Sequence, residues 1–402
     1  MAEEIMAGRQ ARFTCDASEE IPSARQVHTN SSTRSFAYGD STIEIIDGIW
    51  HMQIRENSYY AGGLAVGRLL AAAEYPAVNF FRKPHITALF CFFYIFARSH
   101  FRKIRIPKRY LEELRGYAEG TGISYRTLFC MNFIFDVLKK YGLHCSSVTV
   151  AEPDGRMVIG RNTDLFPWIG RLALRWCPSI VLEVTTPSKF RYVHVTPGLF
   201  LGVFNGFNER GIIVLSHQIA ATKERAVSGN LATTLLQRVL LEESADIALA
   251  ESITRSNPIQ RCIGNMIVSS AEGECCIFEI SPGAVKKLCR DTGYLCCVTH
   301  FQDEELAKLH RKNTMASEDR LALMNSLAKK AKATPEDVIA ILKNSDNGIR
   351  FRDSGRSPTN EGTYQSMVFD IAGQRIFVAD GRTLPVSHSG IYREISVNVC
   401  GP

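Results

Sequence analysis

The sequence predicts an α+β fold, and three observations favour it. After Gly142 the chain turns into short β-rich segments joined by tight turns. Helical segments interrupt this part in groups, where an alternating β-α-β pattern would space them evenly. The clearest change of composition falls at about residue 143. We therefore expect two regions, an N-terminal one over 1–144 and a main domain over 145–402.

In the N-terminal region, polar residues of mixed charge over 1–35 predict a tail or a loosely held arm. A strand is expected over 42–52 and a helix over 59–74. Two amphipathic helices follow, over 107–119 and 125–139, because Gly120-Thr121-Gly122 breaks the apolar periodicity between them.

The segment 80–109 is unusual. Its centre, 86–97, reads ITALFCFFYIFA, and its flanks carry eight Lys or Arg residues and no acid. Twelve apolar residues are too few to span a bilayer, which takes about twenty. One interpretation is a buried helix. The other is an interfacial element that contacts a hydrophobic substrate or an anionic lipid surface, which basic flanks suit.

The main domain opens with a predicted hairpin, in which 146–152 and 156–162 flank Pro153-Asp154-Gly155. Proline presets φ and glycine supplies a positive φ, so this tripeptide favours a turn. Similar hairpins are expected around 271–273 and 372–373. Further strand candidates lie at 180–185, 190–195, 199–204 and 212–216, and helices at 231–243 and from about 317 and 334.

Composition narrows the class of protein. The chain has 402 residues, 45% hydrophobic, with a formal charge of +6, and it carries no nucleic-acid-binding signature. Its twelve cysteines form no C-x-x-C pair and no His/Cys spacing that suggests zinc. No metal or organic cofactor is expected. The start of the sequence lacks the pattern of an export signal, which favours reduced thiols and a cytoplasmic location.

A chemical constellation is expected at Cys145. The hairpin that begins there returns the chain to its start, so Arg161, Asn162 and Asp164 are predicted to lie beside the Cys145 thiol. From these residue types alone, two interpretations stay open. One is a catalytic cysteine, and the other is a buried cysteine beside a structural ion pair.

Cys145-Ser146-Ser147 followed by Gly160-Arg161-Asn162-Thr163-Asp164 resembles the cysteine N-terminal-nucleophile (Ntn) hydrolases. The resemblance is strongest to the branch of acyl-coenzyme A:6-aminopenicillanate acyltransferase, and more distant to acid ceramidase and the bile-salt hydrolases. It covers roughly 42–385. Other segments that resemble this branch, in the same order, are 59–67, 114–122, 206–211, 265–282, 298–301 and 363–379.

The resemblance implies the four-layer αββα sandwich of the Ntn hydrolases. It also implies a precursor that cuts itself between His144 and Cys145, with 1–144 staying bound as the smaller fragment. Cys145 would then carry a free α-amine. Because an α-amine titrates near the thiol, Cys145 can act as both nucleophile and base. By resemblance, Arg161 and Asp164 would hold that amine and the region of the substrate carbonyl.

The resemblance also implies an oxyanion hole. Asn208 matches one family asparagine, while the second falls on Thr299, unless a one-residue shift gives the role to His300. Asn162 and a late arginine, Arg350 or Arg352, are the substrate-binding candidates. His194, His217 and His300 are each weighed as a general base and interpreted as structural residues. Glu242 and Glu243 are interpreted as a solvated helix face.

The leading functional hypothesis is an enzyme that hydrolyses or transfers the acyl group of a linear, fatty-acyl amide through an acyl-Cys145 intermediate. A coenzyme A thioester is a candidate acyl donor in the transfer alternative. An alternative of another class is a catalytically silent protein of the same fold that binds lipid or a membrane surface through 80–109. The expected partners are the amide substrate and the chain's own N-terminal fragment. Nucleic acid is not expected, and peripheral membrane attachment is the alternative to a free cytoplasmic location.

Overall fold

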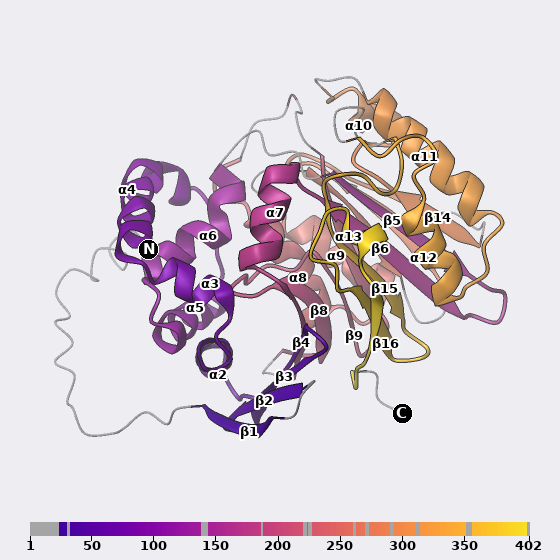
Figure 1. Ribbon diagram of the computed structural model, residues 1–402. Coiled ribbons are helices and arrows are strands. Elements are labelled where there is room, and N and C mark those ends of the chain that lie inside the picture. The colour runs from indigo at the N-terminus through magenta and orange to yellow at the C-terminus, as the bar shows by residue number, and fades with distance from the viewer. Residues whose placement is uncertain are drawn as a thin grey trace, which may run out of the picture.

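The computed structural model describes residues 24–29, 33–137, 144–185, 188–219, 223, 227–259, 263–269, 273–289, 293–310, 314–350 and 356–399. Two β-sheets lie face to face at its centre, with helices on both outer sides (Figure 1). Across these ranges, no helix combines the length and apolarity that crossing a membrane requires.

The larger sheet has eleven strands. They are antiparallel except for the parallel pair β4–β7. Their order across the sheet is β1 (Arg25–Thr29), β2 (Thr33–Tyr38), β3 (Ser41–Ile46), β4 (Ile49–Ile54), β7 (Ser179–Val184), β8 (Tyr192–Pro197), β9 (Asn205–Asn208), β10 (Ile213–Ile219), β11 (Ile263–Ser269), β12 (Cys275–Ile280) and β13 (Val285–Cys289).

The smaller sheet has six strands and is antiparallel throughout. Their order is β14 (Tyr294–Cys297), β5 (His144–Ala151), β6 (Met157–Asp164), β15 (Thr363–Asp370), β16 (Arg375–Ala379) and β17 (Tyr392–Ser396).

Side chains that alternate along the strands build three apolar layers. The middle layer joins the two sheets, with Val181 and Phe207 of the larger sheet packed in one cluster with Ile159 and Phe369 of the smaller one. The outer layers pack the helices onto the sheets. This is the αββα sandwich, so the predicted fold class is confirmed.

One group of helices covers the larger sheet and another covers the smaller sheet (Figure 1). The first includes α2 (Tyr59–Ala72), α5 (Lys108–Thr121), α6 (Tyr125–Val137), α8 (Thr233–Glu243) and α9 (Ile247–Ser256); the second includes α11 (Met315–Ala328) and α12 (Pro335–Lys343). The remaining helices are α3 (Pro76–Phe81), α4 (Pro84–Phe101), α7 (Pro167–Trp176), α10 (Glu304–Ala307) and α13 (Val386–Ser389).

The N-terminal region is part of the larger sheet. Of the segment predicted as a loose arm, 25–29 form β1 and 33–35 begin β2, while 1–23 and 30–32 lie outside the described residues. The single strand predicted over 42–52 is two strands. Asp47 and Gly48, with φ of 49° and 86°, make the turn between β3 and β4. Asp-Gly is a strong signal for such a hairpin turn. A third difference is 199–204, where Leu199 has a positive φ of 73° and no strand forms.

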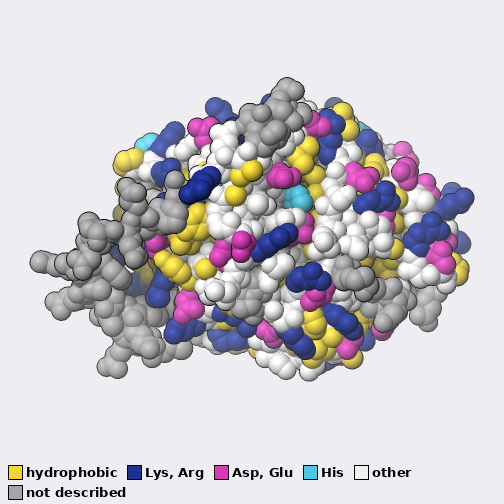
Figure 2. Space-filling model, turned by 90° about the horizontal axis from the view of Figure 1, so that it is seen from below, with side chains coloured by type: hydrophobic (Ala, Val, Ile, Leu, Met, Phe, Trp, Pro, Cys, Tyr) yellow, Lys and Arg dark blue, Asp and Glu magenta, His cyan; other side chains and the backbone are white. Residues whose placement is uncertain are grey.

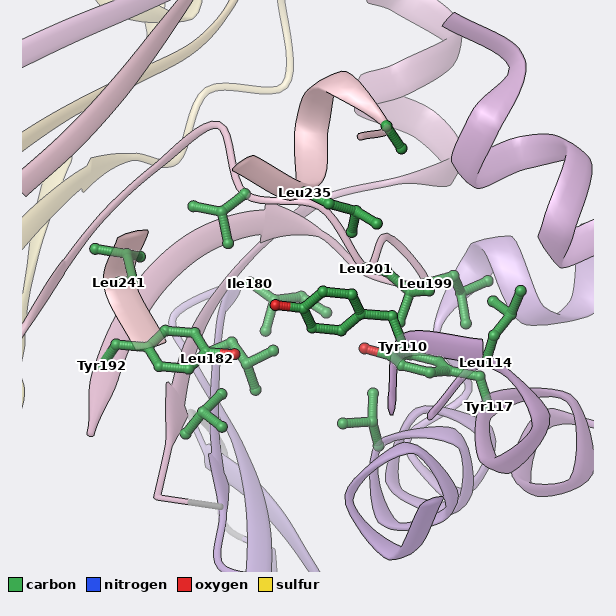
Figure 3. Close-up of a cluster of buried hydrophobic side chains, with 14 of the residues drawn as sticks. Tyr110, Leu114, Tyr117, Ile180, Leu182, Tyr192, Leu199, Leu201, Leu235 and Leu241 are labelled. Carbon is green, nitrogen blue, oxygen red and sulfur yellow. The ribbon is translucent and has the colours of Figure 1, made fainter. Parts of the chain in front are cut away.

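Two segments that resemble family motifs, 59–67 and 114–122, pack against each other as α2 and α5. A Cβ on Gly63 would lie 2.1 Å from the Glu113 carbonyl oxygen, and one on Gly116 would lie 2.2 Å from the Tyr60 carbonyl oxygen. Only glycine permits this approach, so the spacing of glycines in both motifs sets the helix crossing. From α5, Tyr110 and Tyr117 reach into the cluster shown in Figure 3, beside strand residues such as Leu182.

Cys276 of β12 and Cys289 of β13 form a disulfide. The expectation of reduced thiols is therefore wrong for this pair. Disulfides are typical of oxidising compartments, and the cytoplasmic location stays a prediction.

Candidate active site

The β5–β6 hairpin forms as predicted and brings the two ends of the constellation together. Cys145 pairs with Thr163, and His144 pairs with Asp164. The turn holds Gly155 at a φ of 86°, and the Asp154 carboxylate accepts the Arg156 backbone N–H. The second residue of β5 therefore lies beside the last residues of β6.

The Cys145 thiol is almost fully buried, at 1% exposure, and contacts a buried guanidinium. Arg161 Nη2 donates to Cys145 Sγ over 3.3 Å, and Arg161 Nε donates to Thr163 Oγ1 over 3.1 Å. Burial raises the pKa of the Cys145 thiol, and the charge of Arg161 opposes that rise. The sequence correctly predicted this contact.

Asp164 is fully buried and held by three groups from elsewhere in the chain. Thr363 Oγ1 donates to one carboxylate oxygen over 2.6 Å, and Asn360 Nδ2 donates to the other over 2.8 Å. Arg320 Nη1 lies 3.7 Å from the same carboxylate. Burial raises the pKa of Asp164 to about 6, against the opposing charge of Arg320.

Arg320 is the residue that the sequence analysis missed. It lies on α11, is fully buried, and donates from Nη2 to Thr299 Oγ1 over 3.0 Å. Burial lowers its pKa, and its interaction with Asp164 opposes that shift. A signal was present in the sequence, because Arg320, Met324 and Ala328 follow helical spacing and share the buried face of α11. Thr299 thereby joins the site through Arg320.

Asn162 faces the other side of β6. Its amide donates over 2.9 Å to the carbonyls of both Leu342 and Pro358, and its oxygen accepts from Ser366. One amide hydrogen is therefore used by α12 and the other by the carbonyl of Pro358, which leaves none for a substrate. The arrangement gives Asn162 a structural role, and its predicted substrate contact finds no support here.

Asn208 is also placed away from Cys145. Its neighbour Phe207 points into the layer between the sheets, so Asn208 points to the opposite face of the larger sheet. There its amide donates to the carbonyls of Leu241 and Ser244, over 3.0 and 2.8 Å. In this conformation Asn208 has no hydrogen left for an oxyanion, so its predicted role is not supported by the geometry.

The remaining candidates divide by location. Arg350 is exposed beyond α12, and Arg352 lies outside the described residues. His217 Nε2 is 2.8 Å from Ser147 Oγ, two residues along β5 from Cys145, and His300 Nδ1 is 2.9 Å from Ser317 Oγ. His194 is buried on the opposite face of the larger sheet, where burial lowers its pKa to about 3. Within the described ranges, no group of His, Cys, Asp and Glu side chains is placed to hold a metal ion.

The fold and the site together define the class of protein. In this αββα sandwich a buried cysteine near the start of an inner strand lies beside an arginine and an aspartate on the next strand, which is the arrangement of the Ntn hydrolases. Residues 150–383 match the sequence model of a family described as acyl-coenzyme A:6-aminopenicillanic acid acyl-transferase. The chain belongs to this family. The match contains Arg161, Asp164, Thr299 and Arg320, and Cys145 lies five residues before it.

Among solved structures, penicillin V acylase from Agrobacterium tumefaciens is 16% identical with a TM-score of 0.43, over 58% of this chain and 82% of that one. The Caenorhabditis elegans orthologue of N-acylethanolamine-hydrolyzing acid amidase is 14% identical with a TM-score of 0.43, over 62% and 100%. A conjugated bile acid hydrolase from Clostridium perfringens is 11% identical with a TM-score of 0.36, over 64% and 98%. No curated protein matches the chain.

Proposed function

We propose that the chain is a self-cleaving amidase that acts on a linear, fatty-acyl amide through an acyl-Cys145 intermediate. One observation carries the proposal. The thiol of Cys145 is buried directly after the proposed scissile bond, with Arg161 Nη2 3.3 Å from its sulfur. A charged donor at that distance stabilises negative charge as it develops on sulfur or on an attacked carbonyl oxygen.

In the proposed cut, Cys145 Sγ attacks the carbonyl carbon of His144. The carbon–sulfur bond forms, the peptide carbon–nitrogen bond breaks, and the thiol proton passes to the new α-amine. Water then hydrolyses the thioester. This step releases a carboxylate on His144 and returns the free thiol, so the products are fragments 1–144 and 145–402.

In the mature enzyme, the α-amine of Cys145 would take the proton from its own thiol as Sγ attacks the substrate amide. The amine portion of the substrate leaves with that proton, and water resolves the acyl-thioester to a fatty acid. Asp164, which pairs with His144 across the hairpin, would stabilise the charged α-amine. Its hydrogen bonds to Thr363 and Asn360 hold the carboxylate in place for this role.

The oxyanion would be met by Arg161, because Nη1 of this buried side chain has no hydrogen-bond partner among the described residues. Thr299 and Arg320 support the same site through the 3.0 Å hydrogen bond between them. Whether water or an amine resolves the thioester decides between hydrolysis and transfer. The matched residues are compatible with either outcome, and a coenzyme A thioester is the proposed donor for transfer.

The test compares the intact masses of the wild-type chain and Cys145→Ala. We expect two fragments from the wild type, with a new N-terminus at Cys145, and one uncut chain from the variant. Cys130→Ala, which removes another buried thiol in α6, serves as the matched control and should cut normally. The cut protein is then incubated with a long-chain N-acyl amide, with and without a primary amine acceptor.

An uncut wild-type chain after prolonged incubation would leave Cys145 without an α-amine and would contradict the mechanism. That outcome would favour the catalytically silent alternative.

A further inference from the structure

We propose that the exposed face of α4 docks the protein peripherally onto an anionic lipid bilayer. This inference goes beyond the proposed chemistry and needs no step of it. Four large apolar side chains project from this one helix: Leu89, Phe92, Ile95 and Phe96 are 60%, 61%, 64% and 68% exposed. Contiguous exposed apolar surface of this kind marks an interaction site.

The four side chains form one face. Their spacing of three, four and seven residues brings them to the same side of the helix. The rings of Phe92 and Phe96 lie 4.3 Å apart between centroids. This face is therefore a continuous apolar strip along the middle of α4.

The opposite face of α4 is fixed to the protein. Ala97 and Phe101 are buried, and the Phe101 ring lies 5.2 Å from the Phe129 ring of α6. This explains why the sequence of α4 shows no polar face: one side belongs to the core and the other is apolar and exposed. Phe90, Phe93 and Tyr94 also pack against the core. Since this side of α4 is held by the protein and no described helix can span a membrane, α4 would lie in the plane of the interface.

Charge selects the occupant. The segment 80–109 has no acidic residue. The exposed Lys83 precedes the apolar strip, and the exposed Arg102 and Lys103 follow it. By contrast, Figure 2 shows acidic and basic side chains interspersed over the face seen from below. A strip of apolar side chains with basic ends matches an anionic bilayer, where the cations reach the headgroups and the rings reach the acyl boundary.

The same pattern disfavours a second copy of the chain as the occupant. Two copies that paired these strips along their length would bring together two segments that carry basic residues and no acidic residue to offset them. The described surface of α4 therefore fits an anionic lipid better than it fits a second copy of α4.

The test uses the full chain carrying Cys145→Ala, so self-cleavage and activity cannot affect the result. Binding is measured by co-sedimentation with vesicles of phosphatidylcholine alone and of phosphatidylcholine mixed with phosphatidylglycerol. We expect binding to the mixed vesicles that falls with added salt. Changing Leu89, Phe92, Ile95 and Phe96 to Ser should weaken it by at least about tenfold, because the apolar contact is lost.

The matched control is Met315→Ser with Ile391→Ser, which removes apolar side chains that are 53% and 61% exposed elsewhere. Met315 begins α11, at the opposite end of the molecule from α4 in Figure 1. This variant should bind like the parent. A third variant, Lys83→Gln with Arg102→Gln and Lys103→Gln, should lose the preference for phosphatidylglycerol. Circular dichroism and urea midpoints confirm that each variant is folded.

Three outcomes would overturn the proposal. The first is that the parent chain fails to bind either vesicle, and the second is that the serine variant binds as well as the parent. The third is that no vesicle binds and the α4 face instead drives dimerisation, which the serine variant abolishes. None of these outcomes bears on whether Cys145 cuts the chain, so the two proposals fail separately.

Discussion

Two clusters in this molecule bury arginine, and they treat it differently. On the outer face of the larger sheet, every nitrogen of Arg238 is engaged: Nη2 lies 2.6 Å from Glu113, Nε lies 2.8 Å from Glu242, and Nη1 donates to Leu201. At the candidate active site, Arg161 Nη1 and Arg320 Nε and Nη1 have no hydrogen-bond partner among the described residues. Burying such donors costs free energy, and in the proposed mechanism they are the donors that would stabilise the negative charge of the oxyanion.

The paired cluster has a structural purpose. Glu113 belongs to α5 of the N-terminal region, while Arg238 and Glu242 belong to α8 of the main domain. Tyr59 and Tyr110 donate to the Glu242 carboxylate across the same seam. Glu242, interpreted from sequence as a solvated residue, is 1% exposed, so that interpretation was wrong. The comparison predicts large stability effects at one cluster and large activity effects at the other.

The largest expected effect is on stability, from Arg238→Met. Removing this cation leaves Glu113 and Glu242 buried without their main partner, which should lower the free energy of unfolding by about 3–5 kcal/mol. Urea denaturation measures it. Arg255→Met is the control, because its pair with Glu251 is surface-exposed and should contribute at most about 1 kcal/mol. Equal losses of unfolding free energy in both variants would contradict the interpretation that the Arg238 cluster stabilises the fold.

Arg161→Met should instead act on chemistry. It leaves Asp164 with Arg320, Thr363 and Asn360, so stability should change less than in Arg238→Met. Self-cleavage and amide hydrolysis should slow about 10²–10³-fold, as when a positioned oxyanion donor is lost. Arg161→Lys, which keeps the charge but loses the planar fork, should recover part of the rate. Cleavage at the wild-type rate in Arg161→Met would remove Arg161 from the mechanism.

Asp164 predicts a pH dependence of stability. Its pKa rises from 3.8 to about 6 on folding, so the folded chain binds this proton more tightly than the unfolded chain does. The free energy of unfolding should therefore fall as pH increases from about 4 to about 6, by about 3 kcal/mol for two units. Asp164→Asn lacks this contribution, so the difference between the two stability–pH curves isolates it. Parallel curves would show that folding does not shift the pKa of the Asp164 carboxyl group.

The smallest expected effect is at Thr299. Thr299→Val removes the oxygen that accepts from Arg320 Nη2, worth about 1 kcal/mol, and should slow cleavage about five- to tenfold. Thr299→Asn supplies another acceptor at the position where the family resemblance places asparagine, and should restore the rate. Single-turnover cleavage in both variants measures the effect. If Val and Asn behave alike, the Thr299–Arg320 bond does not support the site.

Sequence reasoning succeeded where contacts follow from local geometry. The Pro153-Asp154-Gly155 turn fixes the hairpin, and the hairpin alone brings Arg161 and Asp164 to Cys145. It failed where a contact depends on tertiary packing. Arg320 reaches Asp164 from a helix 156 residues later in the chain, and no local pattern encodes that approach. Asn208 and Asn162 resembled site residues in type, but strand alternation turned their side chains to faces occupied by α8 and α12.

The parallel pairing of β4 with β7 has a consequence for the order of folding and the proposed self-cleavage. Strands from before and after the proposed scission point share one hydrogen-bonded sheet. The β5–β6 hairpin, which carries Cys145, belongs to a sandwich that is complete only when both portions have assembled. Folding would thus act as a checkpoint for maturation, since a chain that failed to assemble its first portion would remain dormant. After the nick, the pieces would persist as one interlocked particle, and two separately expressed polypeptides should reconstitute it only if they fold together.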